Sequence, residues 1–311
     1  MSYNQIDLQT GKTVAKYCDT PEYFDILSIL DCTTGGNYGG EFTIFAKIMC
    51  DKAKVEYCTQ VMTYNAGPNS LTAVSEFIHE PNDWYYEPIG EGLYGYDPVT
   101  KTVYYLAKEE DSNVLGVIAA SASEMTFTAF STPSKYINVG SFYEVSSQTF
   151  YVAALEENSR IVLTEYDVST KSVKQSQVTL GVKVDPSEEG YFSIFVYENM
   201  LYANLVSRST DTTKDFPLWI GSIDLVSLAV TPIIQESGVA VNYIPYAMYP
   251  FAFEPATGYL SAYVETKNHT YNQPKLLYIV DMSTGQFTKS DVLFKHDAQI
   301  VNGGEVMLSP F

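Results

Sequence analysis

One short phrase recurs along this chain, and its spacing limits the folds that the chain can adopt. In each copy, a run of strand-forming residues is followed by an acid, an apolar residue and small polar residues, and then a new strand-like run begins. Asp224 lies 57 residues after Asp167, and Asp281 lies 57 residues after Asp224, while another copy surrounds Asp7. Equal spacing at this length is typical of proteins built from repeated structural units.

The residue types in the phrase suit a tight reversal of the chain. The aspartate side chain can accept backbone N–H hydrogen bonds within the turn, and Thr-Gly favours a sharp change of direction. Helix-period stretches are almost absent, whereas short runs of Val, Ile, Tyr, Phe and Thr are frequent, and the chain holds 26 tyrosines. The sequence therefore predicts an all-β protein in which the phrase joins two strands.

A second phrase, consisting of a strand, a short turn and an aromatic strand, precedes the acid phrase. It occurs at 93–105, 141–152 and 251–262. We interpret it as the first hairpin of a four-stranded unit, and the acid phrase as the link between the third and fourth strands. On this interpretation the full units occupy residues 22–80, 87–131, 136–181, 189–236 and 243–295.

The two chain ends are predicted to complete a sixth unit. Residues 3–8 and 12–17 have the character of a third and fourth strand, and residues 299–301 and 305–309 can supply the first two. Such closure removes the exposed sheet edges that would otherwise promote aggregation.

In its period and its hairpin phrasing, the chain resembles the β-propeller superfamily over nearly its full length. The resemblance is architectural, because the Gly-His and Trp-Asp pairs of WD40 repeats and the repeated double glycine of kelch repeats are absent. It implies a single domain over 1–311, a six-bladed β-propeller of four-stranded antiparallel blades, closed by pairing of the N- and C-terminal strands. Five or seven blades are the alternatives.

The excess of acidic over basic residues limits the classes of binding partner. The chain has 37 acidic and 18 basic residues, a formal net charge of −19. Nucleic-acid binding depends on clustered Lys and Arg, so this composition argues against a nucleic-acid partner and against an anionic membrane surface. No stretch approaches the ~20 apolar residues needed for membrane insertion. We expect a protein partner, or a small polar ligand or glycan.

The cysteines and the N-terminus bear on the compartment. All four cysteines (Cys18, Cys32, Cys50 and Cys58) lie in the first fifth of the chain without a C-x-x-C pair. We interpret them as small buried residues in a reducing compartment, with a disulfide as the alternative. The N-terminus has no basic segment followed by an apolar run. A cytoplasmic protein is expected, and a processed secreted form is the alternative.

The predicted binding region is the long-loop face of the ring. First-to-second and third-to-fourth strand turns are short, while the other connections are longer and more variable, as binding loops usually are. The segments that enter each innermost strand should surround the mouth of the central channel. Their acids, amides and aromatic residues are the candidate binding residues: Glu22, Tyr23, Glu87, Glu91, Tyr136, Asn138, Glu188, Glu189, Asn242, Tyr243, His296 and Asp297.

No catalytic signature is present in the sequence. There is no G-x-S-x-G elbow, no H-E-x-x-H and no P-loop. We therefore predict a non-enzymatic ligand- or protein-binding propeller without a cofactor. One alternative is a calcium-dependent hydrolase of the lactonase or phosphotriesterase type, which some six-bladed propellers resemble in plan, with Glu, Asn and Asp holding the ion. A carbohydrate-binding lectin is the second alternative.

Overall fold

The structure is a computed structural model of the chain. It describes residues 2–6, 13–17, 26–34, 41–51, 56–65, 70–79, 86–88, 94–109, 114–131, 136–184, 190–207, 218–240, 251–254, 257–266 and 275–292.

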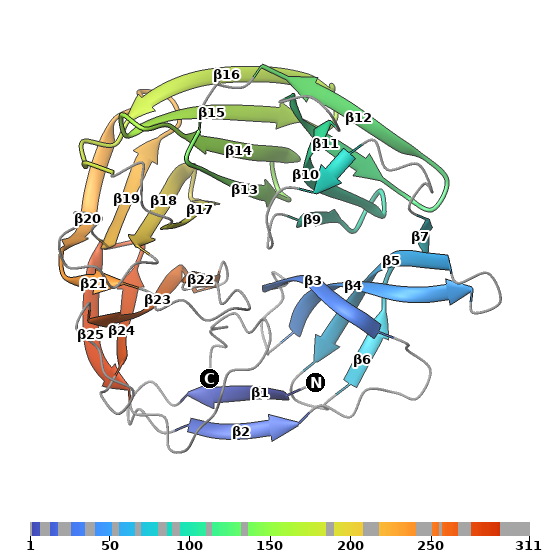
Figure 1. The fold of residues 1–311 in the computed structure, drawn as a ribbon, viewed down its shortest axis with the longest axis horizontal. Helices are drawn as coiled ribbons and strands as arrows, with labels where there is room; N and C mark the ends of the chain where they lie inside the picture. The colour runs from blue at the N-terminus through green and yellow to red at the C-terminus, as the bar shows by residue number, and fades with distance from the viewer. Residues whose placement is uncertain are drawn as a thin grey trace.

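The protein is an all-β propeller. Five antiparallel sheets, here called blades 1 to 5 in chain order, stand around a common centre, and a two-stranded hairpin lies between blade 5 and blade 1 (Figure 1). Each blade has four strand positions, with the first strand nearest the centre and the fourth on the outside (Figure 1). No helix occurs in the described ranges, so none of them holds a helix that could cross a membrane.

The first two blades each contain one strand position that two short strands share. In blade 1 the outer position is shared by β6 and β7, and in blade 2 the inner position is shared by β8 and β9. Blade 1 consists of β3 (Ile26–Thr34), β4 (Glu41–Asp51), β5 (Glu56–Asn65), β6 (Ser70–Ala73) and β7 (Ile78–His79). Blade 2 consists of β8 (Tyr86–Pro88), β9 (Tyr94–Asp97), β10 (Thr102–Glu109), β11 (Leu115–Ala120) and β12 (Met125–Phe130).

Blades 3 and 4 have four continuous strands each, and blade 5 again divides its inner position, between β21 and β22. Blade 3 consists of β13 (Asn138–Glu144), β14 (Thr149–Leu155), β15 (Arg160–Asp167) and β16 (Ser172–Thr179). Blade 4 consists of β17 (Gly190–Tyr197), β18 (Met200–Ser207), β19 (Leu218–Asp224) and β20 (Val230–Glu236). Blade 5 consists of β21 (Val239–Ala240), β22 (Phe251–Glu254), β23 (Tyr259–Thr266), β24 (Lys275–Asp281) and β25 (Gln286–Val292).

These blades confirm the repeat predicted from the acid phrase, and the predicted unit boundaries agree with the sheets to within a few residues. The described residues form five blades, one fewer than the six predicted. At the sixth position the hairpin of β1 (Ser2–Ile6) and β2 (Thr13–Tyr17) supplies the two strands expected from the N-terminus. The partner strands expected at 299–301 and 305–309, and with them the predicted closure, lie outside the described residues.

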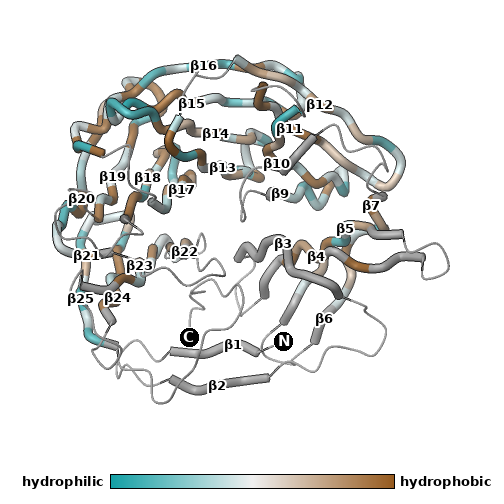
Figure 2. The backbone as a smooth tube through the Cα atoms, viewed as in Figure 1, coloured by the Kyte–Doolittle hydropathy of each residue, from teal (hydrophilic) through white to brown (hydrophobic). Residues whose placement is uncertain are grey.

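The hydrophobic core lies between neighbouring blades. Between blades 3 and 4, Leu163 and Val178 belong to one buried cluster with Phe192, Leu201 and Trp219. Similar clusters join blade 1 to 2, blade 2 to 3 and blade 4 to 5. Hydrophobic residues therefore follow the inner and middle strands, while the outer strands carry more hydrophilic residues (Figure 2). Burial of each such aliphatic or aromatic side chain contributes about 1.5–3 kcal/mol, which holds the ring together.

One expectation about the cysteines is wrong. Cys58, on the third strand of blade 1, is fully buried and disulfide-bonded rather than a free thiol. The side chains of Cys18, Cys32 and Cys50 lie outside the described set. The spacing of the cysteines along the chain could not show this bond, because the sheet register rather than the sequence separation decides which sulfur atoms meet.

Candidate functional site

The short turns of the blades share one backbone geometry. In six of them a residue with a carboxylate ends one strand, and the residue four positions later has a positive φ before the next strand begins. One of the six joins β22 to β23, with Glu254 and Gly258 (69°), and the carboxylate side chain is described in the other five. The carboxylates are Asp97, Glu144, Asp167, Asp224 and Asp281, and the positive-φ residues are Lys101 (54°), Gln148 (51°), Lys171 (56°), Leu228 (60°) and Gly285 (69°).

The carboxylate of each turn binds the turn's own backbone. Asp224 Oδ1 accepts hydrogen bonds from the N–H groups of Val226, at 2.9 Å, and Ser227, at 2.6 Å. The predicted role of the acid phrase is therefore confirmed. Asp97 and Glu144 have the same role in the first hairpins of blades 2 and 3, where the sequence analysis did not assign it.

In the third-to-fourth turns of blades 3, 4 and 5, these hydrogen bonds lower the pKa of the aspartate. The pKa of Asp281 is lowered, chiefly by the Ser283 hydroxyl, and the pKa of Asp224 is lowered, chiefly by the backbone N–H of Ser227. Hydrogen bonds to the charged form stabilise that form relative to the neutral acid. The carboxylates of this face, here called the short-turn face, thus serve the fold, and we look for a ligand site at the opposite, long-loop face.

At the long-loop face, the inner strands of blades 3 and 4 are joined by a predicted site residue. Asn138 Nδ2 donates a hydrogen bond to the Gly190 carbonyl at 2.6 Å, and Asn138 Oδ1 accepts one from Val139 N–H at 2.8 Å. Asn138 begins β13 and Gly190 begins β17, so this amide connects the entrances of two inner strands. Asn138 therefore holds these two strand ends together, and both ends of its amide are already engaged.

Close approach of the same two strands requires a glycine. A Cβ atom added to Gly140 would lie 3.3 Å from three backbone atoms of residues 192–194 in β17. This distance is shorter than an ordinary van der Waals contact, so β13 and β17 can lie this close only because Gly140 has no side chain.

Tyr136 is the other predicted site residue whose side chain is described. It is half-buried and packs against the hydrophobic cluster between blades 2 and 3. Burial raises the pKa of its phenol, since the charged phenolate is disfavoured away from water. Tyr136 and Asn138 therefore lie together at the long-loop end of blade 3.

The inner strands of blades 2 and 5 are interrupted at the same level. In blade 2, Pro88 pairs with Ala107 and Tyr94 pairs with Tyr105, so five residues, 89–93, separate inner-strand residues whose partners are only two positions apart. In blade 5, Ala240 pairs with Glu265 and Phe251 pairs with Ala262, so 241–250 separate partners that are three positions apart, and we call both segments insertions. Tyr105 and Ala262 are each the fourth residue of the second strand, so the regular inner strand resumes at the same level after both insertions.

Three of the predicted site residues fall in these insertions, and a fourth adjoins one of them. Glu91 belongs to 89–93, Asn242 and Tyr243 belong to 241–250, and Glu87 pairs with Lys108 in β8, beside the first insertion. The convergence of the full set on the axis stays a prediction, because these candidates lie outside the described residues: Glu22, Tyr23, Glu91, Glu188, Glu189, Asn242, Tyr243, His296 and Asp297.

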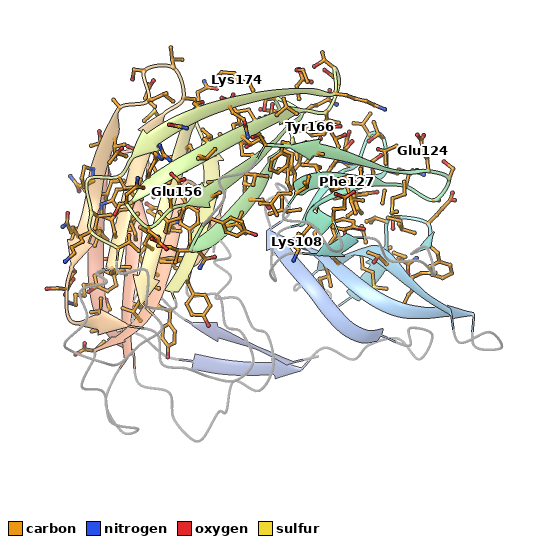
Figure 3. All side chains as sticks on the ribbon, turned by 45° about the horizontal axis from the view of Figure 1, so that its top comes forward. Lys108, Glu124, Phe127, Glu156, Tyr166 and Lys174 are labelled. Carbon is orange, nitrogen blue, oxygen red and sulfur yellow. The ribbon has the colours of Figure 1, made fainter. Side chains whose placement is uncertain are left out.

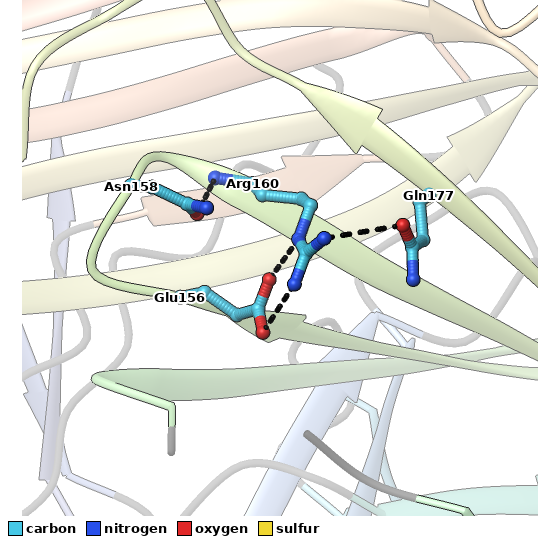
Figure 4. A network of polar contacts seen from close by, with 4 residues as sticks. All are labelled: Glu156, Asn158, Arg160 and Gln177. Atoms are coloured by element: carbon cyan, nitrogen blue, oxygen red, sulfur yellow. Dashed lines mark hydrogen bonds and ion pairs between the residues drawn. The ribbon is translucent and has the colours of Figure 1, made fainter. Parts of the chain in front are cut away.

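The long-loop face of blade 3 departs from the predicted pattern. Its second-to-third connection is only four residues, 156–159, and it is fixed by the contacts drawn in Figure 4. Arg160 Nε and Nη2 both donate to the Glu156 carboxylate, and Arg160 Nη1 donates to Gln177 Oε1 at 3.3 Å. The Glu156 carboxylate raises the pKa of Arg160. This tight bidentate pair leaves blade 3 without a long binding loop at that position.

The outer rim carries paired charges. Lys174 Nζ lies 2.7 Å from Glu165 Oε1 on the outside of blade 3, where Figure 3 shows Lys174 on the exterior of the ring. At the junction of blades 4 and 5, the Tyr278 hydroxyl and Lys289 both donate to the Glu236 carboxylate. Burial, and then the hydrogen bond to Glu236, raise the pKa of Tyr278 to about 12. These clusters join strands rather than form an open site.

No group of three or more His, Cys, Asp or Glu side chains that could hold a metal ion occurs within the described part of the chain. The acids and amides invoked for a calcium site at the channel mouth lie mainly outside it. The calcium alternative therefore rests on the sequence alone.

Comparison with known proteins identifies no relative. No protein-family model and no curated protein matches the chain. Among solved structures, it is similar to an oligogalacturonate lyase in complex with manganese, with a TM-score of 0.49, 10% identity, and 96% of this chain and 85% of the other covered. It is also similar to the SapL1 lectin in complex with α-methyl fucoside, with a TM-score of 0.46, 11% identity, and 92% of this chain and 86% of the other covered. The similarity to the β-propeller domain of the Trilobed protease from Pyrococcus furiosus has a TM-score of 0.45 and 9% identity, and it covers 91% of this chain and 76% of the other.

Proposed function

We propose that this protein is a non-enzymatic binding propeller whose ligand site lies at the long-loop end of the central axis. The observation that supports this most directly is the pair of insertions in the inner strands of blades 2 and 5, which end at the same level. Where regular strand pairing is interrupted, the side chains point in new directions, and such interruptions are frequent next to functional sites. The remaining inner strands of the described ring provide a rigid frame for them.

The residues of the insertions suit a polar ligand. Glu91, Asn242 and Tyr243 offer a carboxylate, an amide and an aromatic hydroxyl, which are the groups that hydrogen-bond and stack on sugars. The net charge of −19 favours neutral or cationic ligands over anionic ones. A glycan or another neutral polyol is the ligand class that we favour.

Two measurements on the purified chain test this function. The labelled protein is applied to a glycan array, and its melting temperature is recorded with calcium chloride and with EDTA. We expect capture of at least one glycan class and no change in melting temperature on chelation. A bound calcium ion, with a large fall in melting temperature in EDTA, would contradict the proposal and support the hydrolase alternative.

Variants then locate the site. Glu91→Gln and Asn242→Ala should each weaken the captured interaction at least fivefold, because each removes a polar contact to the ligand. Asp291→Asn changes an exposed acid on the outer strand of blade 5 and serves as the control. Equal losses in all three variants would show that general charge, and not the channel mouth, holds the ligand.

A further inference from the structure

The outer strand of blade 1 is broken by a bulge; the outer strand pair of blade 3 has no register shift, and that of blade 4 has a smaller one at Ile220 and Gly221. Ala73 pairs with Met62 and Ile78 pairs with Thr59, so the four residues 74–77 face only residues 60 and 61 of β5. Extra residues of this kind turn the following side chains away from the regular direction of the strand.

Buried polar side chains hold this bulge in place. Ser75 Oγ accepts a hydrogen bond from Val61 N–H at 2.9 Å and donates one to the Glu76 carbonyl at 2.8 Å. Gln60 Nε2 donates to the Ser75 carbonyl at 3.1 Å. Ser75 and Gln60 are 9% and 6% exposed, so the bulge is a built part of the blade and not a loose edge.

A hollow of about 410 Å³ lies beside the bulge, between blade 1 and the β11–β12 turn of blade 2. It is lined by Gln60, Glu76, Phe77 and Ala122. Phe77 is 40% exposed, which is high for a phenylalanine, and Glu76 is also exposed, while Gln60 is almost fully buried. The described lining of the hollow therefore combines an exposed aromatic ring and carboxylate with a buried amide.

The described lining residues offer two acceptor groups, while the Gln60 Nε2 donor is already bound to the Ser75 carbonyl. Gln60 Oε1 is buried and accepts a hydrogen bond from none of the described residues, and Glu76 supplies a carboxylate. None of the four lining residues is basic. A buried acceptor without a donor is unfavourable, so a ligand that brings N–H groups would satisfy it.

We propose that this hollow binds an organic cation, namely a guanidinium or ammonium group on an apolar stem. The carboxylate and the amide oxygen match the N–H donors of the cation, and the Phe77 ring offers a cation–π and stacking surface. The net charge of −19 attracts such a ligand from a distance. This site lies on the outer side of blades 1 and 2 and is distinct from the proposed site on the axis.

The proposal is tested with N-acetyl-arginine amide as the probe and its neutral citrulline counterpart as the chemical control. Binding is followed by two-dimensional NMR of the labelled full-length protein. We expect saturable shifts with the arginine probe alone. Glu76→Gln should weaken its binding by up to about fivefold, the range of an exposed ion pair. Phe77→Ala should weaken it by about two- to fivefold through the lost cation–π contact.

Two further variants make the result decisive. Ala122→Trp places a large ring in the hollow from an exposed turn, so it should abolish binding while the fold and the charges are preserved. Glu157→Gln removes an exposed acid on blade 3 and should leave binding unchanged. The proposal is overturned if the citrulline probe binds equally well, if Glu157→Gln weakens binding as much as Glu76→Gln, or if the arginine probe does not bind.

Discussion

Blades 3 and 4 differ from blades 2 and 5 in one part of the sheet only. All four blades keep their second, third and fourth strands, and the short turn after the third strand has the same carboxylate geometry in blades 3, 4 and 5. The inner strand is continuous in blades 3 and 4 and interrupted in blades 2 and 5. Among blades 2 to 5, the repeat therefore keeps the second, third and fourth strands and varies the strand nearest the axis.

The inner strands are the part of the blades that can differ from a regular propeller without loss of stability. The core lies between the faces of neighbouring blades, so the second and third strands carry most of the buried side chains. An inner strand borders the axis on one edge, and residues can be inserted there without disturbing the packing of the faces. We therefore expect the ligand site at the inner strands, where inserted residues leave the packing between blades unchanged.

The largest effect should come from substitutions at the glycines of the inner strands. A Cβ on Gly95, in the interrupted blade 2, would lie 2.2 Å from Tyr143 Cβ on β13, whereas one on Gly140 would lie 3.3 Å from β17. We expect Gly95→Ala to lower the free energy of unfolding by about 3 kcal/mol and Gly140→Ala by about 1 kcal/mol, measured by denaturant unfolding. A neutral Gly95→Ala would mean that β9 is not packed against blade 3.

The next effect concerns the turns. Asp97 is only 1% exposed and accepts hydrogen bonds from Val99 N–H and the Thr100 hydroxyl, both at 2.8 Å. Asp97→Ala should lower the free energy of unfolding by about 2 kcal/mol, because the two donors lose a charged partner. Glu144→Ala, at the same position of the continuous blade 3, should have a smaller effect because Glu144 is more exposed. If both variants lost the same free energy of unfolding, the burial of the carboxylate would not determine its contribution to stability.

The junction of blades 4 and 5 makes stability depend on alkaline pH. The pKa of Tyr278 is raised from 10.0 to about 12, so the unfolded chain loses this proton at a lower pH than the folded protein. The stabilising contribution is complete below pH 10 and is lost as the pH rises toward 12. Unfolding curves between pH 9 and pH 11 should fall less steeply in Tyr278→Phe. Parallel curves for the two proteins would assign the alkaline loss to other groups.

The smallest expected effect is an increase in the free energy of unfolding. Lys101 in blade 2 and Lys171 in blade 3 both have a positive φ, a conformation that glycine adopts without strain. Lys101→Gly and Lys171→Gly should each raise the free energy of unfolding by about 0.5–1 kcal/mol, measured by thermal or chemical unfolding. Gly285→Ala, at the equivalent turn of blade 5, should lower it by a similar amount. If the lysine variants are destabilised, their side chains contribute contacts that outweigh the strain of the backbone.

Some features of the candidate sites were predictable and others were not. The long second-to-third connections of blades 4 and 5 agree with the predicted loops, whereas that of blade 2 has only five residues, and Tyr136 and Asn138 lie at the predicted end of β13. The bond between Asn138 and Gly190 was not predicted, because it joins residues 52 apart in two different blades. The hollow at Gln60 and Ala122 was missed for the same reason, since its walls come from separate sheets.

The repeat and the chemistry of its turns follow directly from the order of the residues. Both depend on residues a few positions apart, such as Asp224 and Ser227, so they can be predicted from short segments of the chain. Which strands are interrupted, which glycine permits close approach and which polar groups meet between blades became clear from the folded arrangement alone. Those features depend on sheet register and on packing between distant segments, because the same alternating pattern of apolar residues is compatible with a continuous strand or with a broken one.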